Sequence, residues 1–258
     1  MMKNLFELPE RSPKPRPYGL TMVLDNGYGL DYIKDVLDLN AHLVDYVKIG
    51  WGTSIVTSKL EEKIALYHSF DIPLSFGGTL FELAVLQKKV DALPDKLFEA
   101  KIDIVEISDG SIELTQKEKI GYIEKFTNLG FKVVSEVGSK DDNVVISPKK
   151  WVEQMTRELE AGAWKVIAEG RESGTSGLYR KSHEIRTGLV EEIVDSLPIE
   201  KIIWEAPLKT HQAWFIKQFG CNVNLGNIAM DQVIALETLR LGLRSDTLTF
   251  FHGEEAIV

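Results

Sequence analysis

Residues 132–169 read KVVSEVGSKDDNVVISPKKWVEQMTRELEAGAWKVIAE, and the hydrophobic pattern of this stretch decides the fold class. Two short apolar runs, Lys132–Glu136 and Lys165–Ala168, flank the segment Trp151–Ala161, in which apolar residues recur near the 3.6-residue period of an α-helix. Short β-rich runs around an amphipathic segment are typical of two parallel strands joined by a helical crossover. The stretch therefore predicts one strand–helix–strand unit of an α/β protein.

The same unit recurs along the chain from Gly19 onward. Eight strands are predicted, at Leu20–Leu24, Tyr46–Ile49, Pro73–Phe76, Ile102–Ile107, Lys132–Glu136, Lys165–Ala168, Lys201–Trp204 and Asn222–Leu225. Eight helices alternate with them, at Tyr32–Leu39, Lys59–Phe70, Phe81–Val90, Glu118–Leu129, Trp151–Ala161, Glu184–Ser196, His211–Phe219 and Met230–Leu241. An unbroken series of eight units favours a single (β/α)8 TIM barrel, with an open doubly wound sheet as the alternative. Gly130, Gly162 and Gly220 follow predicted helices and are expected to end them in the left-handed conformation.

Length and composition agree with one barrel domain. The chain has 258 residues, of which 44% are hydrophobic and 27% charged, as in ordinary globular proteins. Between Pro9 and Pro17 lie four of the nine prolines, among basic residues. We therefore expect an irregular N-terminal arm over residues 1–18 and the barrel over residues 19–258.

Charge and cysteine content exclude several classes of partner. The net charge of −9 and the absence of a long basic run argue against nucleic acid and against an anionic membrane surface. No stretch has the length of a membrane span, and no N-terminal segment resembles a signal peptide. Cys221 is the single cysteine, which excludes an intramolecular disulfide and predicts a cytoplasmic protein. A homo-oligomer is compatible with the helix residues Trp151 and Trp214, although core positions are expected for both.

A residue able to do chemistry ends nearly every predicted strand. These residues are Asp25, Lys48, Glu106, Glu136, Glu169, Glu205 and Asn224. Barrel enzymes assemble their active sites at this face, so the pattern predicts one convergent pocket. A single carboxylate there could simply cap the next helix, but Glu is a poor cap and four glutamates at one mouth repel one another unless a cation lies between them. An oxygen-ligated divalent cation is implied, and magnesium suits the site better than zinc because Cys and His ligands are missing.

Basic residues are expected at the same rim: Lys48, Lys140, Arg171 and Lys209. Each of them could instead pair with a neighbouring glutamate, but together with the carboxylates they describe a site for a metal and an oxyanion. Gly226 and Asn227 end the eighth strand, where barrels often bind phosphate, although a glycine also suits any tight turn. The segment Ser173–Gly177 opens a long loop that could either close over a ligand or stay a surface loop.

Eight motifs occur in order between Arg16 and Thr247. They are KIGWGTS, GGTLFE, VEISDGSI, EVGSK, EGRESG, WEAPLKTHQAWFIKQFG, VNLGNI and LETLRLGLRSDT. Together they resemble the phosphosulfolactate synthase family over nearly the whole chain. The resemblance implies a (β/α)8 fold and a magnesium-dependent lyase that joins sulfite to phosphoenolpyruvate, giving (R)-2-phospho-3-sulfolactate. In this family that product serves one route to coenzyme M or, in bacteria, sulfolactate formation.

The resemblance also implies roles for individual residues. Mg²⁺ held by some of Glu106, Asp109, Glu136, Glu169 and Glu205 would stabilise the enediolate-like charge that builds when sulfite attacks C3. Lys140 is the first choice for the acid that protonates C2, with Lys48 or Lys209 as alternatives. Arg171, Lys209 and the amides of Gly226 and Asn227 are expected to bind the anionic groups of the substrates.

Three positions depart from the family pattern. Members commonly carry two lysines after EVG, whereas here Ser139 takes the first position and only Lys140 remains. His211-Gln212 replaces a pair of glutamines, and Glu169-Gly170-Arg171 replaces a Glu-Ala-Arg triplet. If the missing lysine is the proton donor, the chain binds its ligands without turning them over. The alternatives are therefore a non-enzymatic protein like the plant heat-stress-associated relatives, or another phosphoenolpyruvate or sugar-phosphate barrel enzyme such as an aldolase.

Overall fold

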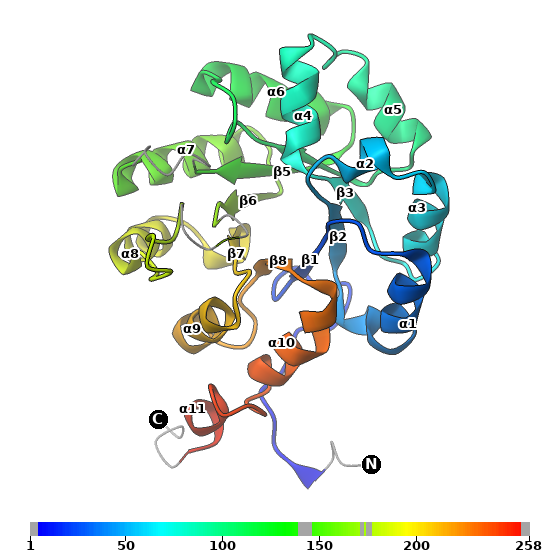
Figure 1. Ribbon diagram of the computed structural model, residues 1–258. Helices are drawn as coiled ribbons and strands as arrows, with labels where there is room; N and C mark the ends of the chain where they lie inside the picture. Colours follow the sequence, from blue (N-terminus) through cyan, green and yellow to red (C-terminus); the bar gives the residue numbers. More distant parts are fainter. Residues whose placement is uncertain (1–4, 139–145, 171–172, 174–176, 254–258) are drawn as a thin grey trace.

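Eight parallel strands form a closed barrel in chain order (Figure 1). The computed structural model describes residues 5–138, 146–170, 173 and 177–253. The strands are β1 (Thr21–Asp25), β2 (Tyr46–Ile49), β3 (Leu74–Phe76), β4 (Ile104–Ile107), β5 (Lys132–Val137), β6 (Lys165–Ala168), β7 (Ile202–Glu205) and β8 (Leu225–Ile228). Because β1 pairs with both β2 and β8, the sheet has no free edge. The predicted single (β/α)8 barrel is confirmed, and the doubly wound alternative is wrong.

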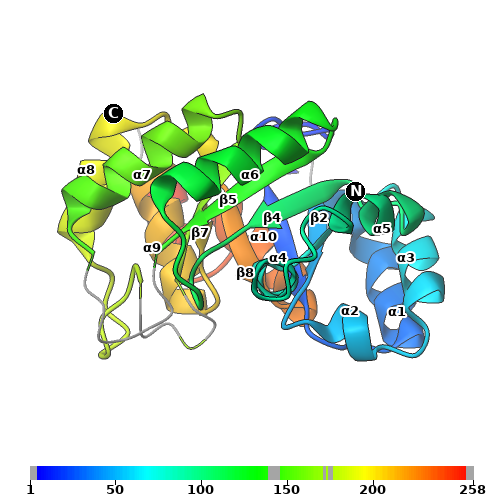
Figure 2. The same ribbon diagram turned by 90° about the horizontal axis from the view of Figure 1, so that it is seen from above.

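Helices surround the barrel, as Figures 1 and 2 show from two directions. They are α1 (Leu30–Asn40), α2 (Thr53–Val56), α3 (Leu60–His68), α4 (Gly78–Leu86), α5 (Leu93–Glu99), α6 (Gln116–Asn128), α7 (Pro148–Glu160), α8 (Thr187–Ser196), α9 (Lys209–Phe219), α10 (Val233–Arg240) and α11 (Leu248–His252). The short helices α2, α5 and α11 were not predicted, since none offers two full turns of clear apolar periodicity. Gly130 and Gly162 have positive φ values of 91° and 105°, in agreement with the prediction; Gly220 also has a positive φ of 82°, but its ψ of 174° is outside the left-handed helical region.

The last strand corrects one predicted boundary. β8 begins at Leu225 and not at Asn222, so Asn224 precedes the strand. Its side chain accepts a hydrogen bond from the Leu20 amide and donates to the carbonyl of Ile202, both at the N-terminal ends of strands. An Asn side chain that binds nearby backbone replaces ladder hydrogen bonds, which explains the late start of the strand. Asn224 therefore lies at the opposite end of the barrel from the predicted pocket.

An apolar layer fills the barrel interior toward the N-terminal ends of the strands. Its members are Leu20, Met22, Tyr46, Ile104, Val134, Ile167 and Ile203, all at most 2% exposed. Two larger apolar clusters pack the outer face of the sheet against the helices, and Trp151 is buried in one of them, as expected. Side chains along a strand alternate between the two faces, so the residue two positions after each interior residue also points inward. This alternation decides which strand-end residues can meet.

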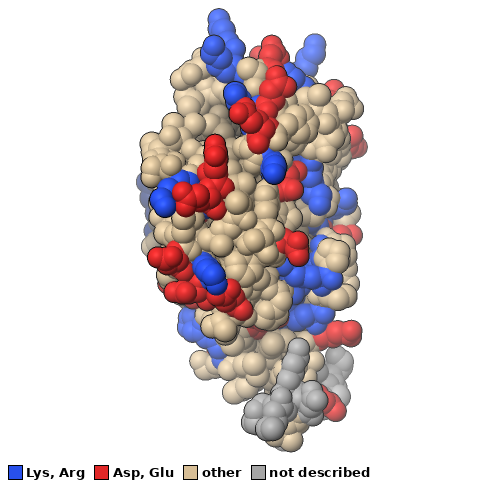
Figure 3. Space-filling view, turned by 90° about the vertical axis from the view of Figure 1, so that its right-hand side faces the viewer, with Lys and Arg blue, Asp and Glu red and all other residues tan. Residues whose placement is uncertain are grey.

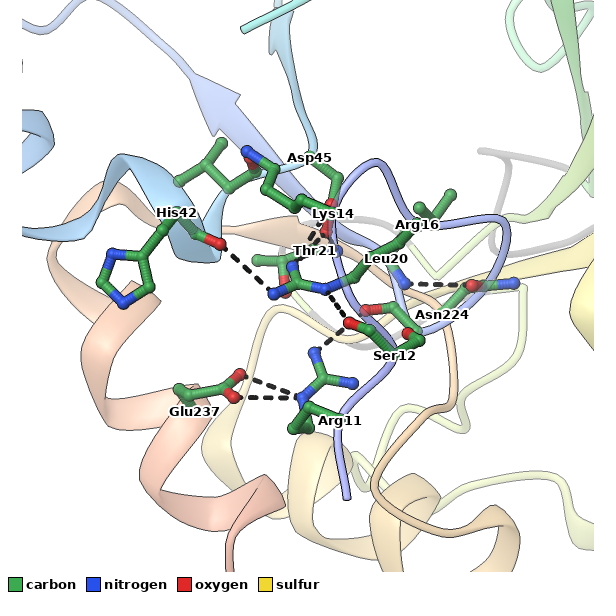
Figure 4. Close-up of polar contacts among 12 residues, drawn as sticks. Arg11, Ser12, Lys14, Arg16, Leu20, Thr21, His42, Asp45, Asn224 and Glu237 are labelled. Carbon is green, nitrogen blue, oxygen red and sulfur yellow. Dashed lines mark hydrogen bonds and ion pairs between the residues drawn. The ribbon is translucent and has the colours of Figure 1, made fainter. Parts of the chain in front are cut away.

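The N-terminal arm, residues 5–18, is tied to the chain around β8 and α10 (Figure 4). The Arg11 guanidinium donates to the Glu237 carboxylate at 3.1 Å, to Asn222 Oδ1 at 2.5 Å and to the Cys221 carbonyl at 3.0 Å. Arg16 makes an ion pair with Asp45 at 3.0 Å. These contacts join segments far apart in sequence.

Charges of both signs cover the face that carries α3 and α5 (Figure 3). Lysine and arginine side chains lie interspersed with aspartate and glutamate on this face. Two exposed ion pairs belong to these helices: Lys59, which precedes α3, pairs with Glu62, and Lys96 pairs with Glu99 on α5. Among the described residues, no helix is both long enough and apolar enough to cross a membrane.

We predict that Arg11→Ala lowers the free energy of unfolding by about 1–3 kcal/mol, because Glu237 and Asn222 lose their charged donor in a largely buried place. Urea unfolding followed by circular dichroism measures the change. The control is Lys59→Ala, which removes an exposed ion pair and should cost less than about 0.5 kcal/mol. Equal losses in the two variants would contradict a fastening role for the arm.

Candidate active site

A pocket of about 250 Å³ opens at the C-terminal ends of the strands. Among the described residues, five charged side chains line it: Lys48, Glu106, Glu136, Glu169 and Glu205. Each stands two positions after an interior apolar residue, namely Tyr46, Ile104, Val134, Ile167 and Ile203. Strand alternation therefore points all five toward the barrel axis. The predicted convergence of these residues is confirmed.

Three of the carboxylates form a compact group. Glu136, Glu169 and Glu205 each offer an oxygen atom, and the three atoms lie within 4.8 Å of one another. The residues are 4%, 2% and 1% exposed, so water screens their charges poorly. Only oxygen ligands are offered, which suits a hard divalent cation such as Mg²⁺.

Lys48 joins the remaining carboxylate to this group. Its ammonium donates to Glu205 Oε1 at 3.0 Å and lies 3.4 Å from Glu106 Oε2. Burial lowers the pKa of Lys48, but the carboxylates of Glu106, Glu205 and Glu136 outweigh burial and hold that pKa well above its ordinary value. Lys48 is therefore charged, and it serves as the counter-ion of the acidic cluster.

Glu106 has a strongly perturbed carboxyl group. Burial raises the pKa of Glu106 to about 7, Lys48 opposes the rise, and Glu136 adds to it. Glu106 Oε1 also accepts a hydrogen bond from the Gly78 amide at 2.7 Å.

The charges do not balance within the described lining of the pocket. Four carboxylates face one ammonium there, which leaves an excess of negative charge when all of them are ionised. Like charges at this distance stay ionised together only with a cation among them. A divalent ion between Glu136, Glu169 and Glu205 would remove most of the excess, so the residues present fit magnesium.

Asp109 is not part of the cluster, contrary to expectation. Its carboxylate accepts from the Lys119 ammonium of α6 at 2.8 Å, and it does not line the pocket. Asp109 follows the end of β4, where strand alternation no longer fixes the direction of a side chain.

Asp25 also points away from the pocket. It is 0% exposed and accepts hydrogen bonds from Lys63 and Tyr67 of α3 and from two backbone amides of its own loop. Met22 faces the interior, so the odd offset of three residues turns Asp25 to the outer face of the sheet.

Two further expected ligands are corrected. Lys209 begins α9 and pairs with Asp246 at 3.0 Å, with 42% of its side chain exposed, and it does not line the pocket. Gly226 lies within β8 and is not among the described residues that line the pocket; a Cβ atom there would come 2.3 Å from the terminal methyl of Met22. Lys140, Arg171 and Ser139 lie outside the described residues, as does most of the segment Ser173–Gly177.

Asn227, by contrast, lines the pocket as predicted. Its backbone is left-handed, with φ of 56°, and its Oδ1 is buried without a hydrogen-bond partner among the described residues. A buried amide without a partner is costly, so a ligand group that binds it would remove the cost.

The segment Gly77-Gly78-Thr79 follows β3 and contains the start of α4. All three residues line the pocket. A Cβ atom on Gly78 would come 2.4 Å from the Cβ of Ser108, so only glycine allows its amide to reach Glu106. The spacing Gly-Gly-Thr after a strand was the available signal, but no role was assigned to it.

Tyr179 and His211 also escaped the sequence-based prediction. Their rings stack at 3.8 Å, and the Tyr179 hydroxyl donates to the Glu205 carbonyl. The Leu178 amide donates to the Glu169 carbonyl at 2.9 Å. The loop that returns from β6 to α8 is therefore fastened to the backbone of two cluster residues, a long-range contact that no local pattern reveals.

Several known proteins are similar to this chain in sequence. The family model of (2R)-phospho-3-sulfolactate synthase (ComA) matches residues 9–246. The phosphosulfolactate synthase of Bacillus subtilis is 48% identical over 94% of this chain and 97% of its own length. The phosphosulfolactate synthase of Methanothermobacter thermautotrophicus is 42% identical over 94% and 96%.

More distant relatives also match. The Arabidopsis thaliana protein HEAT-STRESS-ASSOCIATED 32 is 24% identical over 92% of this chain and 91% of its own. Among solved structures, 3-hexulose-6-phosphate synthase from Salmonella typhimurium is similar with a TM-score of 0.56, at 12% identity, over 87% of this chain and 100% of that one. At this identity the structural likeness supports the fold alone.

Trp51 at the pocket mouth allows a test of the backbone geometry, because its φ of 56° is a strained value for a bulky residue. We predict that Trp51→Gly is more stable to urea than Trp51→Ala by about 1 kcal/mol, since glycine loses the left-handed penalty and alanine keeps it. Both variants remove the indole, so the difference isolates the backbone. Equal stabilities would argue against the left-handed turn.

Proposed function

Because the chain belongs to the (2R)-phospho-3-sulfolactate synthase family, we propose that it adds sulfite to phosphoenolpyruvate with the help of Mg²⁺, giving (R)-2-phospho-3-sulfolactate. A C–S bond forms at C3 of phosphoenolpyruvate, the double bond between C2 and C3 is lost, and one proton is added at C2. The observation that carries the proposal is the group of three buried carboxylates in a pocket at the catalytic face of the barrel.

The described residues support the metal-binding part of the proposal. Glu136, Glu169 and Glu205 would hold Mg²⁺, and Lys48 keeps Glu205 and Glu106 oriented through its ion pairs. The bound ion would supply the positive charge that the substrate carboxylate needs as electron density moves onto it. The Gly170 amide, which donates to Glu205 Oε2 at 3.0 Å, holds the second oxygen of that residue.

The contacts favour Lys140 as the proton donor among the three lysines considered. Lys48 is paired with two carboxylates, and its raised pKa makes it a reluctant acid near neutral pH. Lys209 is turned outward to Asp246. We therefore propose that Lys140 protonates C2.

Other observations weigh against the alternatives. An aldolase that forms a Schiff base needs a lysine whose pKa is lowered, whereas the pKa of Lys48, the lysine of the described pocket lining, is raised. Three curated synthases are 41–48% identical to this chain, against 24% for the plant heat-stress protein. The synthase reading is therefore the better supported.

We predict that the purified protein consumes phosphoenolpyruvate and sulfite only when Mg²⁺ is present. Loss of a residue that only supports a metal ligand typically weakens metal binding by roughly 10–100-fold. Glu169→Gln removes a proposed ligand itself, so calorimetry should show a Mg²⁺ Kd raised by at least that factor. Glu62→Gln, an exposed control on α3, should bind Mg²⁺ like the wild type. Sulfite consumption in the presence of a chelator would refute the metal requirement, and no consumption under any condition would favour the non-enzymatic alternative.

We predict that Lys140→Ala lowers kcat by about 10²- to 10⁴-fold, the usual contribution of a general acid, while the Kd for Mg²⁺ changes little. Steady-state kinetics with calorimetry on the same samples measures both. Ser139→Ala is the matched control and should keep the wild-type rate. The role of Lys140 would be contradicted if the wild type were inactive and Ser139→Lys, which restores the second lysine of the family, were active.

A further inference from the structure

Lys119 of α6 is a buried lysine that contacts the backbone of Glu136 and that the proposed mechanism does not use. Its side chain is 2% exposed, and it does not line the pocket. Its ammonium lies 2.8 Å from Asp109 Oδ1, 3.2 Å from Glu158 Oε1 and 2.5 Å from the backbone carbonyl of Glu136. The three N–H groups of the lysine therefore have three acceptors, each from a different element of the fold.

The carbonyl of Glu136 lies beyond the last residue pair between β5 and its neighbour β4. The register between β4 and β5 ends at the pair Ile107 and Ser135, and β4 ends at Ile107, whereas β5 continues to Val137. A buried carbonyl past the end of a ladder needs another donor. Lys119 supplies that donor, in the place where a longer β4 would have offered a backbone amide.

We propose that Lys119 is a positioning residue, which fixes the end of β5 so that the Glu136 carboxylate stays at the metal-binding distance from Glu169 and Glu205. The inference rests on the proposed Mg²⁺ site. Lys119 does not touch the reacting atoms. It acts through Glu136, and by binding Asp109 as well it ties the loop after β4 to the end of β5.

Lys63 offers a matched control on the other side of the barrel. It is also a buried lysine on a helix, 3% exposed, and it pairs with the fully buried Asp25 at 2.9 Å. Among the described residues, neither Lys63 nor Asp25 lines the pocket or belongs to the group of three carboxylates. Replacing either lysine by methionine removes one buried ammonium and leaves buried carboxylates behind, so both variants should lose stability for the same reason.

The test compares Lys119→Met and Lys63→Met at a temperature where urea titration shows that both are folded. We expect calorimetry to give a Mg²⁺ Kd raised about 10–100-fold for Lys119→Met, the usual cost of losing an outer partner of a metal site. Lys63→Met should stay within about threefold of the wild type, because sites without shared partners act nearly independently. High Mg²⁺ should restore much of the turnover of Lys119→Met, since mass action compensates for lost affinity.

A second variant covers the case in which Lys119→Met does not fold. Lys119→Arg keeps the positive charge for Asp109 and Glu158, but a planar guanidinium cannot serve three acceptors arranged around one nitrogen atom. We expect Lys119→Arg to be folded and to bind Mg²⁺ more weakly than the wild type. Wild-type Mg²⁺ affinity in folded Lys119→Met or Lys119→Arg, or equal losses of affinity in Lys119→Met and Lys63→Met, would overturn the positioning role and leave the proposed function intact. Failure of the wild type itself to bind Mg²⁺ would refute the proposed function and this inference together.

Discussion

Repulsion among four buried carboxylates is the constraint on which the active-site face depends. Glu106, Glu136, Glu169 and Glu205 point into one small cavity, because each stands two positions after a residue of the apolar layer that fills the barrel below. The barrel thus sets the direction of the side chains, and their charge sets what else the pocket must contain. Lys48 meets part of that demand with its two ion pairs. In the proposed function a divalent cation bound by the carboxylates would contribute further positive charge, which links the fold to the proposed chemistry.

Hydrogen bonds hold both the side chains and the backbone of the cluster residues in place. The Gly78 amide binds Glu106, the Gly170 amide binds Glu205, and the Lys119 ammonium binds the carbonyl of Glu136. Leu178 and Tyr179 fasten the loop before α8 to the carbonyls of Glu169 and Glu205. A group of like charges tends to spread, so fixed backbone keeps the oxygen atoms close enough for one ion. The same logic explains why glycine is needed at position 78, where a Cβ atom would meet Ser108.

The family relationship and the geometry answer different questions. The matches to curated synthases place the chain in its family over more than nine-tenths of its length. The geometry indicates how this particular chain could perform the reaction with Ser139 in place of a lysine. Lys48 is committed to holding the carboxylates and Lys209 to an ion pair with Asp246. For this reason the proposed function assigns the proton transfer to Lys140, the lysine that the sequence motif retains.

The sequence by itself determined the barrel and the five inward charges. Eight alternating strand and helix patterns sufficed for the fold, because hydrophobic periodicity is a local property of the chain. Lys48 and the four glutamates were found because a residue at the end of a buried strand has only two directions available. Tertiary structure decided the remaining assignments. Asp25 faces outward to Lys63, Asp109 turns to Lys119, Lys209 pairs with Asp246, and Asn224 lies at the other end of the barrel. Each of these outcomes depends on a partner distant in sequence or on a strand boundary shifted by a few residues, and a shift of one residue reverses the face to which a side chain points.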